Sequence, residues 1–170
     1  NDPSEGLDKL HQSLKADSGL LIMVYGPYGR YPVYLLQTIM GLLDRDSADP
    51  KTRIERAKRM LASLPPYHWA QMAAGQFLEL KEQNDAGIYD MLLHSQDQAY
   101  SIPQFYSLVE SAGLKLVELV DQIQYDAHRY LPNEFWPLLS DMSDQELFSL
   151  GELLNGRIIK HSAFIVDQNY

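Results

Sequence analysis

The chain has 170 residues and a mass of 19.5 kDa, the size of one domain or of a large part of one. Its apolar share of 45% and charged share of 22% exclude a disordered, collagen-like or low-complexity chain. Asp and Glu number 23 against 14 Lys and Arg, a formal net charge of -9, so neither a nucleic acid nor a membrane is expected as a partner. Cysteine is absent, which excludes disulfides and Cys-ligated metals and fits a reducing, cytoplasmic setting.

The N-terminal segment predicts a helix followed by a buried strand. Asp2 and Pro3 are suited to cap and begin a helix over residues 3–16, where leucines recur at helical spacing. Residues 20–25 are apolar on both alternating faces, which is typical of a central strand with helices on both sides of its sheet. A loop is expected over residues 26–30.

The middle of the chain predicts helices. Apolar spacing favours one over residues 32–43, a second that begins at Asp49 and stops at Pro65-Pro66, and a third over residues 67–82.

The last third predicts a helix, a strand, a helix and a strand. Ser101 and Ser143 each begin a capping-box pattern, and Gly113 and Gly156 stand where the two helices should end. The two apolar runs expected to be strands are residues 114–120 and 157–167. Helices that alternate with apolar strands favour an open α/β sheet with helices on its faces.

Three segments carry a family resemblance. Residues 2–25 contain the turn Lys-Ala-Asp-Ser-Gly before the first strand, and residues 92–114 contain Leu-Leu-His, Tyr-Ser-Ile-Pro-Gln-Phe and Ala-Gly-Leu. The third segment is the final helix and strand, which includes His-Ser-Ala-Phe. In this order they resemble the C-terminal half of a class I S-adenosylmethionine-dependent methyltransferase, with its fifth and sixth strands and a seventh strand inserted antiparallel beside the fifth.

The cofactor-binding half of that family has no counterpart in the chain. The family's Gly-rich turn and the acid after its second strand hold the cofactor, and no Gly-x-Gly-x-Gly is present. The resemblance therefore implies that residues 1–170 are the C-terminal part of an open Rossmann-like sheet of about three strands, the last one antiparallel. It implies that residues 31–90 are a helical insertion or lid. S-adenosylmethionine would serve the intact enzyme, and this chain alone is expected neither to hold it nor to be active.

The first strand needs a neighbour that these residues do not supply. It would pair with the final strand on one side only, and soluble proteins cover an apolar strand edge. We expect the cover to be the missing N-terminal half or a second copy of the chain. The chain begins with Asn1 rather than Met, so it is expected to start inside a longer gene product.

Tyr25, Tyr28 and Arg30 follow the first strand, and ligands of open α/β sheets bind at the carboxyl ends of strands. These residues are candidates for substrate binding, with Arg30 able to pair with a carboxylate. The alternative is a packed aromatic turn with a solvated arginine.

His94 and Asp97 are the candidate catalytic residues, since a histidine near a carboxylate can act as a general base. The alternative is that His94 caps local backbone and Asp97 begins a turn.

Aromatic residues form two further candidate substrate-binding groups. Tyr67, His68 and Trp69 could line a pocket and attract a cationic sulfonium, but a helical core is the favoured explanation of these residues. Tyr125 lies in a long polar-aromatic loop of the kind that often carries function. The histidine spacing predicts no metal site.

The favoured function is the substrate-side portion of a methyltransferase acting on a small molecule. The alternative is a non-enzymatic interaction or dimerisation module that retains the methyltransferase topology. A start codon at the first residue would favour the module.

Overall fold

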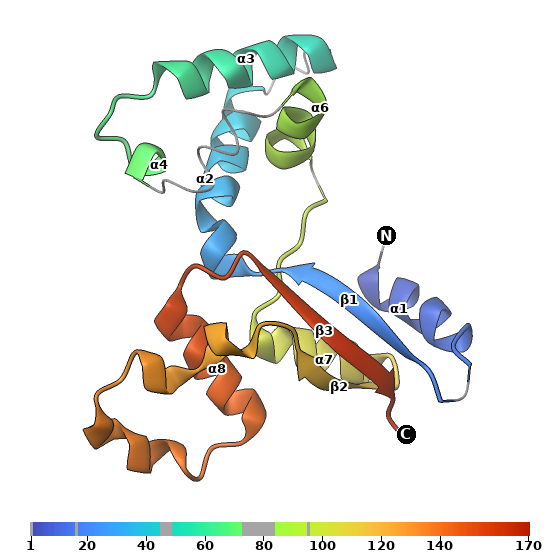
Figure 1. The fold of residues 1–170 in the computed structure, drawn as a ribbon. Coiled ribbons are helices and arrows are strands. Elements are labelled where there is room, and N and C mark those ends of the chain that lie inside the picture. Colours follow the sequence, from blue (N-terminus) through green and yellow to red (C-terminus); the bar gives the residue numbers. More distant parts are fainter. Residues whose placement is uncertain (1, 16, 45–48, 73–83, 95) are drawn as a thin grey trace. The chain divides into compact units, whose positions relative to one another are not determined.

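The computed structural model describes every residue except 1, 16, 45–48, 73–83 and 95 (Figure 1). Its elements are helices α1 (Pro3–Gln12), α2 (Pro27–Leu43), α3 (Pro50–Ser63), α4 (Trp69–Met72), α6 (Asp85–Ile88), α7 (Ile102–Ser111) and α8 (Asp144–Asn155), the π-helix η1 (Tyr89–Leu93), the 3₁₀-helices η2 (Gln122–Tyr125), η3 (Ala127–Arg129) and η4 (Asn133–Leu139), and strands β1 (Gly19–Tyr25), β2 (Leu114–Leu119) and β3 (Lys160–Asp167). The predicted α/β class is confirmed.

The three strands form one sheet in the order β1-β3-β2. The last strand, β3, is antiparallel to both neighbours, with Gly19 opposite Val166 and Tyr25 opposite Lys160. The prediction that the final strand lies antiparallel beside the first strand is therefore confirmed, and the structure adds that it lies between the other two. β3 begins at Lys160 rather than at residue 157.

The helix boundaries of the last third follow their capping residues. Ser101 and Ser143 are the N-caps of α7 and α8, and both form the predicted capping box. In the second box the Ser143 amide donates to Oε2 of Glu146 at 2.8 Å. Gly113 and Gly156 follow their helices with φ of 69° and 63°, a left-handed conformation that glycine adopts without strain. These predictions are confirmed because they rest on local backbone chemistry.

The predicted loop over residues 26–30 is wrong, because α2 begins at Pro27. Proline suits the first position of a helix, where its missing N–H costs nothing. Gly26 and Gly29 serve close packing: a Cβ on them would lie 2.5 and 2.3 Å from the carbonyl oxygen of Ile158. The two glycines let the start of the helix approach the chain before β3, and a side chain at either position would prevent this.

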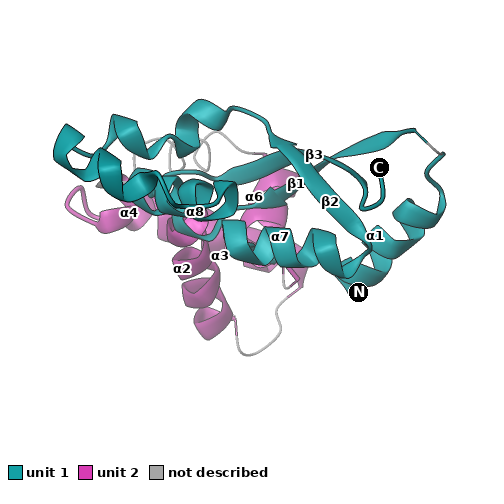
Figure 2. Cartoon of the chain, turned by 90° about the horizontal axis from the view of Figure 1, so that it is seen from below, with its two compact units in different colours: residues 1–29, 98–170 teal, residues 30–97 magenta. Residues whose placement is uncertain are grey.

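The chain divides into two compact units, residues 1–29 with 98–170 and residues 30–97 (Figure 2). The second unit is helical, with a core built from α2, α3 and η1. Within the predicted helix of residues 67–82, the structure describes α4 and residues 73–82 lie outside the described part. That this unit is an insertion or lid over an active site stays a prediction.

The first unit covers one face of its sheet (Figure 1). Leu20, Ile22 and Val24 of β1 pack toward the core that α1 and α7 share with the sheet. The alternate residues Leu21 and Met23 have 60% and 50% of their surface exposed. Residues 1–29 and 98–170 thus leave the other face of β1 open to solvent.

His11 anchors α1 to the end of the sheet. Its Nδ1 lies 2.8 Å from the carbonyl oxygen of Ala112, and its Nε2 lies 2.8 Å from Oδ2 of Asp167. Both partners are acceptors, so both nitrogens donate only when the imidazole is protonated. The hydrogen bond to Asp167 raises the pKa of His11. The pKa of Asp167 is lowered by the backbone amide of Asn169 and then by His11.

Candidate functional site

The carboxyl end of β1 is the place where an open α/β sheet would bind a ligand. There the carbonyl oxygen of Tyr25 accepts a hydrogen bond from the Tyr100 amide at 2.8 Å, and Tyr25 forms a parallel bridge with Ala99. The returning chain therefore lies beside the last residue of the strand. Tyr28, in the first turn of α2, keeps its ring partly exposed.

Arg30 and Asp97 form a buried ion pair. Nη2 of Arg30 donates to Oδ2 of Asp97 at 2.5 Å, and each side chain is only 8% exposed. Gln37 donates to the same oxygen at 3.5 Å, and the guanidinium lies 5.6 Å from the ring centre of Tyr34. Burial opposes the charge on Arg30, but its hydrogen bond to Asp97 and the carboxylate charge outweigh that effect, so the pKa of Arg30 is raised. A substrate carboxylate would have to compete with Asp97 for this arginine.

The predicted pair of His94 and Asp97 is not formed in the described residues. His94 is exposed, and its Nδ1 accepts a hydrogen bond from the Gln96 amide at 3.2 Å. The side-chain contacts of Asp97 are with Arg30 and Gln37. The catalytic role of His94 stays a prediction, without a carboxylate from Asp97 to orient its ring.

The aromatic group after the two prolines does not form one pocket wall. Tyr67 is 83% exposed, whereas Trp69 packs against the core of its unit. The rings of His68 and Trp69 lie 4.9 Å apart, and Nδ1 of His68 accepts from the Ala70 amide. Their proposed role in substrate binding stays a prediction.

Tyr125 belongs to a buried polar network that the sequence did not predict. Its hydroxyl lies 2.8 Å from Nδ1 of His161, and Nε2 of His161 lies 3.0 Å from Oε1 of Glu152. The other oxygen of Glu152 accepts from the Ile102 amide at the start of α7, at 2.8 Å. The side chains of Tyr125, His161 and Glu152 are at most 2% exposed. Tyr125 is thus buried, and its predicted role in substrate binding stays a prediction.

One proton arrangement satisfies the whole network. Glu152 accepts as a carboxylate from Nε2–H of His161, and Nδ1 of the ring accepts the Tyr125 hydroxyl proton. Burial, then the charge of Glu152, raises the pKa of Tyr125, so the phenol stays a donor. A Cβ on Gly26 would come within 3.0 Å of Nε2 of His161, which places the network beneath the carboxyl end of β1.

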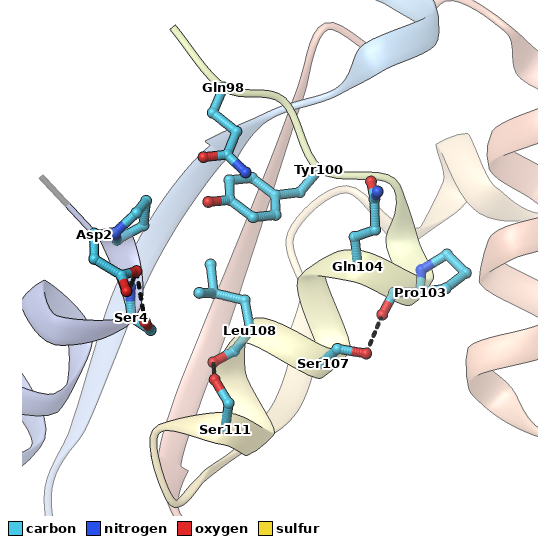
Figure 3. A pocket seen from close by; sticks show the side chains of 10 residues that line it. Asp2, Ser4, Gln98, Tyr100, Pro103, Gln104, Ser107, Leu108 and Ser111 are labelled. Atoms are coloured by element: carbon cyan, nitrogen blue, oxygen red, sulfur yellow. Dashed lines mark hydrogen bonds between the residues drawn. The ribbon is translucent and has the colours of Figure 1, made fainter. Parts of the chain in front are cut away.

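A cavity of about 540 Å³ lies between the start of α1 and one side of α7 (Figure 3). Its rim is polar, but two of the rim hydroxyls already form hydrogen bonds within α7. Ser107 donates to the carbonyl oxygen of Pro103, and Ser111 donates to that of Leu108. The predicted site residues do not line it. The lining residues are Asp2, Pro3, Ser4, Gln98, Tyr100, Pro103, Gln104, Ser107, Leu108 and Ser111.

The described residues lack two further features. They contain no group of three or more His, Asp or Glu side chains placed to hold a metal ion. They also contain no helix with the length and apolar character needed to cross a bilayer.

The strand order and directions define a methyltransferase-like α/β fold. The sequence matches no protein-family model. Among solved structures, the chain is similar to PKMT2 from Rickettsia typhi in complex with AdoHcy, with a TM-score of 0.71 over 98% of the chain and 13% identity. A second structure of PKMT2 from Rickettsia typhi gives 0.64 over 98%, also at 13% identity. The chain spans only 33% and 32% of those two chains.

Proposed function

We propose that the chain is the substrate-side part of an S-adenosylmethionine-dependent methyltransferase. The observation that supports this most is β3, which lies antiparallel beside β1 as the family resemblance implies. The similarity to PKMT2, determined with AdoHcy, supports the same class. AdoHcy is what S-adenosylmethionine becomes after it has donated its methyl group.

The cofactor would be held by residues outside this chain. The described part offers one strand, a glycine and a helix in succession, from β1 through Gly26 into α2, whose first turn contains Gly29. A cofactor-binding glycine leaves room for a phosphate or ribose, whereas here the space beside both glycines is filled by the backbone of Ile158. The turn therefore does not fit the cofactor, and we expect the chain alone to be inactive.

The proposed acceptor is a small molecule bound near the carboxyl end of β1. The net charge of -9 disfavours a polyanionic acceptor. Tyr28 would contact the acceptor there. We also propose His94, of the unit of residues 30–97, as a general base for an oxygen or nitrogen acceptor. Arg30 and Asp97 would fix the start of α2 through their ion pair. Most of the acceleration would come from alignment of the acceptor and exclusion of water.

The open edge of β1 is proposed to receive the N-terminal half of the intact enzyme. β1 is the outer strand of the described sheet, and the Ala99 bridge occupies only its last residue. Leu21 and Met23 expose apolar side chains on the same strand. A strand and helix from the preceding part of the protein would pair with this edge and cover this face. A second copy of the chain is the competing occupant.

Calorimetry of S-adenosylmethionine tests the placement of the cofactor. We expect micromolar binding to the full gene product and none to the 170-residue chain. Micromolar binding to the chain alone would contradict the proposal.

A labelled methyl donor tests the acceptor class with the full gene product and a cell extract. Label in the small-molecule fraction supports the proposed acceptor. Label confined to macromolecules rejects a small molecule but keeps the methyltransferase. No transfer to either fraction favours the alternative, a non-enzymatic interaction or dimerisation module. In that case the 170-residue chain should also sediment as a dimer.

A further inference from the structure

Helix α8 carries apolar side chains on a face that the fold does not use. The face packed inward is formed by Gly151 and Glu152. Leu150 and Leu153 lie on the other side, and Leu153 is 55% exposed. With Met142, these leucines line a cavity of about 570 Å³ that reaches Pro103 at the start of α7.

The walls of this groove carry only negative charge. Residues 101–111 and 131–156, which contain both helices, include no Lys, Arg or His. Glu146 lines the groove itself. The Ser143 amide lowers the pKa of Glu146, which keeps its carboxylate charged near neutral pH. Further exposed acids in these segments are Glu110, Glu134, Asp141 and Asp144.

We propose that the groove lined by Met142, Leu150 and Leu153 docks a polypeptide segment that forms an amphipathic helix with apolar anchors and flanking Lys or Arg residues. A cleft between two helix ends suits anchors spaced three and four residues apart. The negative walls select a cationic partner and disfavour a second copy of this chain, which carries a net charge of -9. This inference does not depend on the proposed methyltransferase activity.

The test is fluorescence anisotropy of the 170-residue chain with a labelled amphipathic peptide of Leu and Lys. A peptide with Glu in place of every Lys is the charge control. We expect saturable binding of the Lys peptide that weakens as salt is raised, and no binding of the Glu peptide. Equal binding of the two peptides, or no saturable binding of either, overturns the proposal.

Leu153→Arg places a cation in the groove and should lower affinity about tenfold or more. Leu10→Arg is the matched control, since Leu10 is 49% exposed on α1, lies outside the groove and gains the same charge. If binding depends on the groove and not on the net charge of the chain, Leu10→Arg should change the affinity less than about twofold. Met142→Arg is the second groove variant, and circular dichroism confirms that each variant is folded. Equal losses in Leu153→Arg and Leu10→Arg refute the site.

Discussion

Replacement of Glu152 by leucine should destabilise the first unit by about 3 kcal/mol. The carboxylate is 1% exposed and accepts from two buried donors, Nε2 of His161 and the Ile102 amide. Each donor left without an acceptor costs about 1–3 kcal/mol, partly offset because leucine has no charge to desolvate. At about 2–4 °C per kcal/mol for a chain of this size, Tm should fall by about 6–12 °C.

Urea unfolding measures this loss in the unit concerned. The chain has two tryptophans, so a Trp69→Phe background leaves Trp136 to report on residues 98–170. Glu152→Gln should cost only about 1 kcal/mol, since its carbonyl can still accept from Ile102. Glu110→Leu, an exposed change on α7, should stay within about 0.5 kcal/mol. A loss below about 1 kcal/mol for Glu152→Leu would refute the assigned role of the network.

Two further predictions concern packing and pH. Gly151→Ala should cost about 2 kcal/mol or more in urea unfolding, because its Cβ would lie within 1.8 Å of the Tyr125 carbonyl oxygen. Gly6→Ala, in open space on α1, should instead stabilise by about 0.5–1 kcal/mol, and equal effects would contradict the packing argument. The raised pKa of His11 adds stability that is complete below its ordinary value of 6.5 and is lost as pH rises through the folded value. Tm measured against pH should show this loss and His11→Gln should abolish it, whereas an unchanged profile would exclude the contact with Asp167.

The sequence predicted the features that depend on near neighbours in the chain. The capping boxes at Ser101 and Ser143 and the glycines at 113 and 156 set helix ends through local hydrogen bonds and φ values. The strand pattern of residues 20–25 was sufficient to place β1. The strand pattern did not show that only one face of β1 is covered, because the cover depends on which other segments are present to pack against the strand.

The site was harder to predict because its contacts join distant residues. Arg30 and Asp97 were assigned to separate roles, yet these residues, 67 positions apart in the sequence, form one ion pair. The burial of His161 could have been predicted, because residues two apart in a strand share a face and Ala163 of β3 is buried. Its partner Glu152 had no such signal, because a charged residue on a helix is usually exposed, yet Glu152 is 1% exposed.

The burial of Glu152 links the two faces of α8. A helix with a leucine stripe would normally turn that stripe inward, but Gly151 allows the opposite side to approach Tyr125 closely. Glu152 then becomes buried at low cost, because His161 and the start of α7 satisfy both of its oxygens. Leu153 is left exposed on the outer side of the helix, with the half-buried Leu150 beside it. The network that secures the region beneath the carboxyl end of β1 therefore also creates the apolar groove proposed to bind a partner.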